Sequence, residues 1–302
     1  MNPKFRHCAM ASLALALAAQ ISTATAAGPV ALTHIHGLSY SADGKQIAIP
    51  SHHGLALYAD GKWSKGAGPE HDYMGYSATR DAIYSSGHPV PGSGLPNPFG
   101  LIRSRDGGKT WDKLGLEGES DFHVLATSYG TNAVYVLNHQ PNSRMKTAGL
   151  YFTLSDGMKW EQAAARGLPA KTGGLAVHPA DPKQVAAATD EGLFLSRDSG
   201  SSFAPLVKGR RVLAATFDLD GKHLWFTGYD GTPTLARVGL QAGAKPESIP
   251  LPAMKKDAVA YIAQNPVRPD EMAIATFNRS VYLSTDRGRQ WRQIASEGVG
   301  GQ

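Results

Sequence analysis

Short motifs rich in histidine recur through the first half of this 302-residue chain. Imidazole nitrogens are common protein ligands of zinc, copper, nickel and iron, so several of them meeting in one pocket would bind a transition metal. We expect zinc or copper as the ion at such a site. The candidate ligands are His34, His36, His52, His53, His88, His123 and His139.

Two carboxylates and one thioether lie in the same motifs. Asp72 lies two residues before Met74, and Asp121 lies two residues before His123. A carboxylate in this setting could ligate a metal, hold a ring N–H group, or act in the acid–base pair of a hydrolase. Asp72 and Asp121 are therefore the candidate catalytic residues. Met74, which would favour copper as a ligand and otherwise packs, is a candidate ligand-binding residue.

Two further features extend the candidate set. Asn278 and Arg279 follow an apolar segment near the end of the chain, where the guanidinium could pair with an anionic ligand. The Pro- and Gly-rich loop 89–98 follows His88 directly and either overhangs the pocket or forms a surface excursion. A single histidine is more often an ordinary hydrogen-bonded residue than a ligand, so the prediction depends on the fold bringing these residues together.

A repeated octapeptide identifies the elements that must position these residues. An apolar strand precedes each copy, glycine supplies a left-handed backbone turn, aspartate accepts backbone N–H bonds, and a terminal aromatic can pack over the hairpin. The copies are SRDGGKTW at 104–111, SRDSGSSF at 196–203 and STDRGRQW at 284–291, with a degraded copy, TLSDGMKW, at 153–160 and a shorter relative, YADGKW, at 58–63.

These octapeptides resemble the Asp-box, or BNR, repeat of sialidases, sortilin-type receptors and bacterial exported propellers. The resemblance implies an all-β fold in which each repeat marks one blade. Predicted strands recur at intervals of about 40 to 50 residues, which is a propeller period. Blades are expected to start with strands at 35–40, 73–78, 122–127, 174–178, 212–217 and 258–263. Second strands are expected at 46–50, 82–86, 133–137, 184–188, 223–227 and 271–276.

The repeats and the spacing of the strands therefore predict a single β-propeller of six four-stranded blades with Asp-box hairpins. Two β-sandwich domains are the structural alternative, and no linker supports them. In a propeller, the starts of first strands and the ends of second strands open on one face. The seven candidate histidines come from three consecutive blades and map to that face, whereas the Asp-box turns map to the other.

One series of motifs also resembles a functional family. HIHGL, SHHGL, DYMGY, SGHP, GLIRSRDGGKTW and DFH, in that order, resemble bacterial exported BNR-repeat proteins described as glycosyl hydrolase-like. A typical sialidase is not expected, because His34-Ile35-His36 stands where an Arg-Ile-Pro-like segment would open the first blade. The leading prediction is a histidine-lined pocket that binds a small ligand, with a metal as its means of binding. The alternatives are a glycoside hydrolase or a protein-binding assembly or sorting propeller.

The first 26 residues have the layout of a secretory signal peptide. A basic start is followed by an apolar run at 9–19 and by the A-x-A sequence at 24–26. We therefore expect cleavage near Ala27, a propeller domain over 27–302, and a periplasmic or secreted location. The only cysteine, Cys8, would be removed with the peptide.

Composition narrows the expected partners. Removal of Lys4 and Arg6 with the signal peptide lowers the formal net charge from +5 to +3, which is too mild to predict nucleic-acid binding. The expected partner is a small-molecule or glycan ligand, with a protein partner left open. No membrane span is expected after cleavage, and a monomer is expected.

Overall fold

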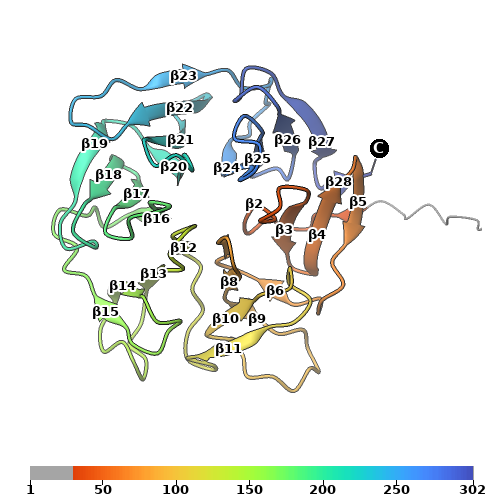
Figure 1. Cartoon of the computed structure of the whole chain (residues 1–302), viewed down its shortest axis with the longest axis vertical. Helices are drawn as coiled ribbons and strands as arrows, with labels where there is room; N and C mark the ends of the chain where they lie inside the picture. Colours follow the sequence, from red (N-terminus) through yellow and green to blue (C-terminus); the bar gives the residue numbers. More distant parts are fainter. Residues whose placement is uncertain (1–29, 302) are drawn as a thin grey trace, which may run out of the picture.

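The computed structural model describes residues 30–301, which form a ring of six β-sheets around a central axis (Figure 1). These residues contain strands, turns and loops and no helix, so the prediction of an all-β, six-bladed propeller is confirmed. None of them therefore forms a helix long and apolar enough to cross a membrane. The predicted signal peptide, residues 1–26, lies outside the described residues.

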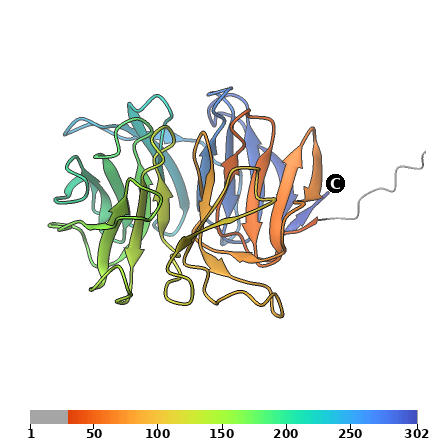
Figure 2. The same cartoon turned by 60° about the horizontal axis from the view of Figure 1, so that its bottom comes forward.

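Each blade contains four consecutive antiparallel strands, with the first nearest the axis (Figures 1 and 2). Blade 1 contains β2 (Ser39–Tyr40), β3 (Ile47–Ser51), β4 (Gly54–Ala59) and β5 (Lys62–Lys65). Blade 2 contains β7 (Ser77–Ala78), β8 (Ile83–Ser85), β10 (Leu101–Ser104) and β11 (Asp112–Gly115). Blade 2 also carries a small ribbon formed by β6 (Asp72–Tyr73) and β9 (Gly87–His88).

The remaining blades complete the ring. Blade 3 contains β12 (Leu125–Thr127), β13 (Val134–Asn138), β14 (Gly149–Thr153) and β15 (Glu161–Gln162). Blade 4 contains β16 (Thr172–Val177), β17 (Val185–Thr189), β18 (Gly192–Ser196) and β19 (Ala204–Lys208). Blade 5 contains β20 (Val212–Phe217), β21 (His223–Tyr229), β22 (Pro233–Gly239) and β23 (Glu247–Ile249). Blade 6 contains β24 (Val259–Gln264), β25 (Met272–Thr276), β26 (Val281–Ser284) and β27 (Arg292–Ser296).

The core lies between blades. Six apolar clusters occupy the six interfaces between neighbouring sheets. Successive side chains of a strand point to opposite faces, so both faces of a middle strand must be apolar. In β13, for example, Tyr135 packs toward blade 4, whereas Val134 and Val136 pack toward blade 2. This requirement explains why the second strands read as nearly continuous apolar runs.

The two ends of the described chain close the ring. Strand β1 (Val30–Ala31) pairs with β28 (Val299–Gly300), which pairs with β27, so the sixth sheet has six strands. Val30 and Leu32 join the apolar cluster between blades 6 and 1. Trp63 of blade 1 donates a hydrogen bond from Nε1 to the Ile294 carbonyl at 2.7 Å. Both pairing and packing therefore join the first blade to the last.

The octapeptide repeats form the turns between third and fourth strands, on the face away from the starts of the first strands. Ser104 Oγ donates to Asp106 Oδ1 at 2.8 Å and accepts from the Gly108 amide at 2.8 Å, while Asp106 accepts from the Thr110 amide at 2.9 Å. The same bonds recur around Asp198 and Asp286. These carboxylates are therefore occupied by the turns.

The degraded copy in blade 3 forms its turn with a different residue. Ser155 takes the place of the aspartate and accepts a bond from the Lys159 amide at 3.1 Å. The shifted Asp156 accepts instead from Arg103 and Tyr84 of blade 2, each at 2.5 Å. The displaced carboxylate thus links two blades.

The inner strands of blades 1 to 3 are much shorter than predicted. Strands β2, β7 and β12 have two, two and three residues, whereas β16, β20 and β24 have six each. The predicted starts at 35, 73 and 122 are therefore wrong for these blades. The segments that precede the short strands, residues 33–38, 72–76 and 120–124, run largely outside the sheet ladders. We call them the lead-in segments, and they carry most of the candidate site.

Candidate functional site

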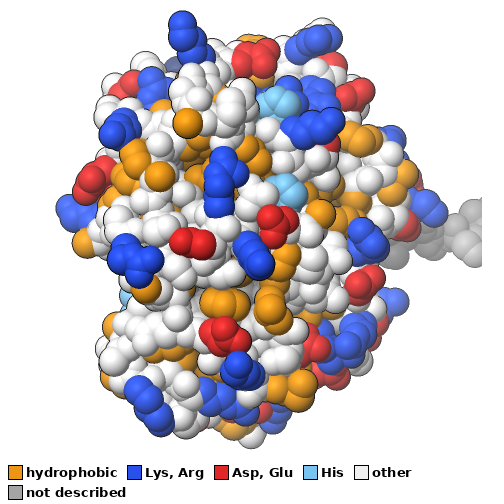
Figure 3. Space-filling model, turned by 60° about the vertical axis from the view of Figure 1, so that its left-hand side comes forward, with side chains coloured by type: hydrophobic (Ala, Val, Ile, Leu, Met, Phe, Trp, Pro, Cys, Tyr) orange, Lys and Arg blue, Asp and Glu red, His pale blue; other side chains and the backbone are white. Residues whose placement is uncertain are grey.

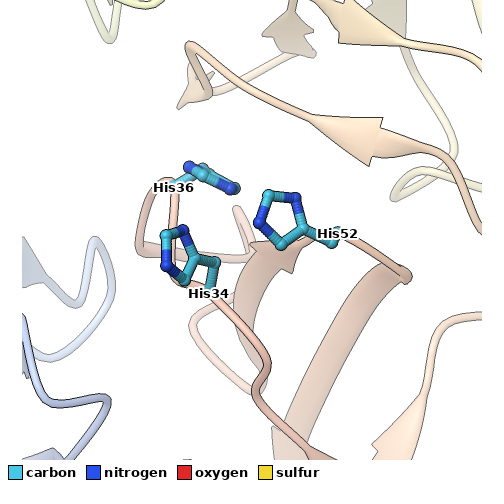
Figure 4. Close-up of side chains that lie close together, drawn as sticks. All are labelled: His34, His36 and His52. Carbon is cyan, nitrogen blue, oxygen red and sulfur yellow. The ribbon is translucent and has the colours of Figure 1, made fainter.

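Three histidines of blade 1 face one another beside the axis (Figure 4). His34 and His36 lie on the lead-in segment before β2, and His52 lies in the turn after β3. One ring nitrogen from each lies within 4.8 Å of the other two. The rings of His34 and His52 are stacked at 4.8 Å, and that of His36 lies edge-on to His52 at 4.9 Å. We call these residues the first group.

Asp72 from blade 2 joins the first group through both carboxylate oxygens. Oδ2 accepts a hydrogen bond from His52 Nδ1 at 2.8 Å. Oδ1 lies 3.6 Å from His36 Nε2, which is too far for a hydrogen bond. Asp72 Oδ1 and His36 Nε2 are both buried, and neither has a hydrogen-bond partner among the described residues. Such atoms are costly to bury unless a ligand, an ion or an ordered water satisfies them.

Burial keeps His36 uncharged at neutral pH. Desolvation lowers the pKa of His36 from 6.5 to about 4. The Asp72 carboxylate opposes this lowering of the pKa, whereas the neighbouring His52, His34 and His123 add to it. A neutral imidazole is the form that ligates a metal, so His36 is held ready for coordination.

A second group lies on the lead-in segment of blade 3 and the ribbon of blade 2. It consists of His88, Asp121 and His123, whose ligand atoms lie within 4.8 Å of one another. Asp121 Oδ2 lies 3.1 Å from His88 Nε2 and 2.5 Å from His123 Nε2. Asp121 Oδ1 is buried and has no partner among the described residues.

Glycines let the lead-in segments approach one another. A Cβ added to Gly37 would lie 3.0 Å from Tyr76 atoms, and one added to Gly75 would lie 1.9 Å from the Phe122 carbonyl oxygen. Real Cβ atoms essentially never come as close as the second value. Gly75 is therefore needed for the contact between the lead-in segments of blades 2 and 3, whereas a side chain at Gly37 would require Tyr76 to shift slightly.

The two groups border an axial channel with a volume of about 340 Å³. Inner strands of all six blades line it, and His36 and His123 contribute at the end where the lead-in segments lie. No Asp, Glu, Lys or Arg is among its described lining residues. By contrast, the outer surface in Figure 3 carries acidic and basic side chains interspersed with one another.

Two of the seven candidate histidines, His53 and His139, belong to neither group. His53 is exposed and lines a small surface hollow with Lys65 and Glu70, because it follows His52 in a tight turn and points the other way. His139 is exposed at the end of β13, where the chain leaves the sheet. Five histidines and two aspartates remain together.

The predicted ligand-binding residues are placed differently from the histidines. Arg279 donates to the Thr33 carbonyl at 3.3 Å, so its guanidinium supports the lead-in segment of blade 1. Asn278 is exposed and donates its side-chain amide to the Lys256 carbonyl at 3.3 Å. Met74 is buried, with 9% of its surface exposed to solvent.

Sequence reasoning missed two features of this region. Asn97, at the end of the Pro-rich loop, accepts a bond at Oδ1 from His88 Nδ1 at 2.7 Å. The sequence signal for this contact was a polar residue, Asn97, nine positions after His88. The second feature is the set of Asp218, Asp220 and His223. Arg237 and Arg287 already pair with Asp218, so this set is an ion-pair network between blades 5 and 6.

Comparisons with known proteins identify the fold. No family model matches the chain, and no curated protein matches it. A GH74 enzyme from Niastella koreensis superposes with a TM-score of 0.59 at 13% identity, covering 88% of this chain and 46% of that one. An ancestral GH74 enzyme gives a TM-score of 0.56 at 11% identity, covering 89% and 39%.

A propeller of similar size also matches. YCF48 bound to a D1 peptide superposes with a TM-score of 0.52 at 15% identity, covering 90% of this chain and 85% of that one. This chain spans less than half the length of either GH74 structure. At these identities the similarity shows a shared β-propeller fold alone.

Proposed function

We propose that this protein is an exported propeller that binds a transition metal ion at the first group and uses the ion to hold a small ligand at the mouth of the axial channel. One observation carries the proposal. His36 Nε2 and Asp72 Oδ1 are buried, unpartnered among the described residues and 3.6 Å apart, beside two further imidazoles.

The spacing of these atoms suits one shared ion. Two ligands on a tetrahedral zinc ion, at bond lengths of about 2.0–2.1 Å, lie about 3.3–3.4 Å apart. The 3.6 Å between His36 Nε2 and Asp72 Oδ1 therefore requires only a small movement. His52 donates its Nδ1 proton to Asp72, which leaves the Nε2 lone pair free. Carboxylates orient metal-binding histidines in this way.

The donor atoms favour zinc or copper. Imidazole nitrogens with one carboxylate oxygen, and no thiolate, suit Zn²⁺ and Cu²⁺, and Cu²⁺ is expected to bind more tightly. Because His36 also lines the channel, a coordination position left open by the protein would face it. The ion would act there as a Lewis acid that holds a donor atom of the ligand. The uncharged channel lining favours a ligand whose remaining part is neutral.

Calorimetric titration of untagged, chelator-treated protein with Zn²⁺ and Cu²⁺ tests the proposal. We expect His36→Ala to abolish binding at the first group, and Asp72→Asn to weaken it about 10- to 100-fold. His139→Ala is the matched control, since this exposed histidine belongs to neither group. Identical isotherms for wild type and His36→Ala would leave the first group as a structural polar network and end the proposal.

A glycoside hydrolase remains the alternative, because two of the similar structures are GH74 enzymes. Asp72 and Asp121 would then be the acid–base pair. Each carboxylate, however, contacts two histidines, and this arrangement suits a metal site better than a general acid. Glycan hydrolysis that survives chelation and is lost with Asp121→Asn would favour the alternative.

A protein partner is a third candidate, because one similar propeller is bound to a peptide. A peptide laid across the mouth of the channel would need no metal. In that case binding would survive His36→Ala and His123→Ala, whereas the metal proposal expects both the ion and its ligand to be lost from the first group with His36→Ala.

A further inference from the structure

The hydrogen-bond arrangement around Asp121 favours a bound cation. Because the Asn97 carbonyl oxygen can only accept, His88 Nδ1 must carry the proton of their 2.7 Å bond. A neutral His88 ring would then turn its Nε2 lone pair toward Asp121 Oδ2, 3.1 Å away. Two acceptors facing each other at this distance repel unless a positive ion or proton lies between them.

The rest of the second group supplies further donor atoms nearby. Asp121 Oδ2 accepts a 2.5 Å hydrogen bond from His123 Nε2, which leaves His123 Nδ1 as the ring atom that can bind a metal. Asp121 Oδ1 is buried without a partner among the described residues. The bond from His88 to Asn97 has the form of an outer-shell bond that fixes the tautomer of a metal-binding histidine. Two imidazoles and a carboxylate are sufficient protein ligands for a divalent ion.

The second group lies directly beside the first. Asp72 and His88 are paired residues in the antiparallel ribbon of β6 and β9. Side chains of directly opposed residues lie on the same face of a ribbon, with Cβ atoms about 5 Å apart. Asp72 contacts the first group and His88 belongs to the second, so the ribbon connects them. His36 and His123 also border the same channel.

We propose that His88, Asp121 and His123 bind a second transition metal ion, so that the propeller holds a two-ion centre at one end of its channel. This inference deepens the proposed function and rests on it. The ribbon of β6 and β9 sets the spacing of the ions, and Asn97 is the positioning residue of the second site. The two sites share no ligand, so each site can be removed separately.

Metal content and Cu²⁺ electron paramagnetic resonance test the proposal on the full protein. Wild type is expected to bind two Cu²⁺ ions, with dipolar broadening and a half-field signal that arise only when the ions are neighbours. His123→Asn and His36→Ala should each bind one ion and give the spectrum of an isolated Cu²⁺. His123 is exposed, so its replacement should preserve the fold, and circular dichroism checks this. His139→Ala should match wild type.

The outcomes separate this inference from the proposed function. One ion in wild type, unaffected by His123→Asn and lost with His36→Ala, would overturn the second site and leave the first intact. Two ions without dipolar coupling would overturn the two-ion centre. No ion in wild type would overturn both proposals.

Discussion

His36 is expected to make the stability of the apo-protein depend on pH. Burial lowers its pKa in the folded state from 6.5 to about 4, whereas in the unfolded chain it should titrate near its ordinary pKa. Above pH 6.5 both states hold a neutral ring, so His36 adds no pH dependence. As the pH falls from 6.5 to about 4, the unfolded chain takes up a proton that the folded protein resists, and stability is lost.

The size of this loss follows from the pKa difference. Since one pKa unit corresponds to about 1.4 kcal/mol, a lowering from 6.5 to about 4 amounts to about 3 kcal/mol of unfolding free energy. Because glutamine does not titrate, His36→Gln should not show this pH-dependent loss of unfolding free energy. The wild type should therefore lose about 3 kcal/mol more than His36→Gln between pH 7 and pH 4.

Urea denaturation at a series of pH values, with a chelator present, measures the difference. The chelator is needed because a bound metal competes with protons for the same nitrogen. His139→Gln is the control and should follow the wild-type profile, since this histidine is exposed. Parallel loss of stability in wild type and His36→Gln would refute the burial argument for His36.

Three further predictions concern the Asp-box turns, the contact between lead-in segments, and the signal peptide. Asp106→Ala should cost about 1–3 kcal/mol of unfolding free energy, because it leaves turn amides unpaired, while calorimetric metal affinity stays unchanged. Gly75→Ala should disturb the contact with Phe122 and reduce metal affinity as well as the melting temperature, and a normal affinity would argue against the role given to this contact. Intact-mass measurement of protein from the periplasm or medium should give a chain starting near Ala27, whereas a cytoplasmic protein that keeps Met1 would contradict export.

The fold was predictable because blades impose a pattern that the sequence displays. The inner strand of blade 5 was predicted at 212–217, where β20 lies, because a regular strand between two apolar interfaces alternates or runs apolar. The same reasoning placed the inner strands of blades 1 to 3 too early. Apolar residues such as Ile35 and Phe122 continue the strand pattern there, but the chain leaves the ladder to bring polar side chains toward the axis.

The site was predictable only in outline. Mapping strand ends to one face selected the correct side for His36, His88 and His123, because their positions depend on topology. Topology does not fix the direction of a side chain in a turn, so it could not separate His53 from His52. The contribution of Asn97 depends on the path of a Pro-rich loop, for which the sequence carries no periodic signal.

The pairing of β1 with β28 means that the ring is closed by residues about 270 positions apart, as Val30 lies opposite Gly300. Loop-closure entropy grows only logarithmically, so closing this span costs about 1.6 kcal/mol more than closing one 45-residue blade. The pairing of β1 with β28 therefore costs little in equilibrium free energy, although it joins segments that lie far apart in the described sequence. Such non-local contacts form slowly, so we expect the seam between the sixth and first blades to form late in folding.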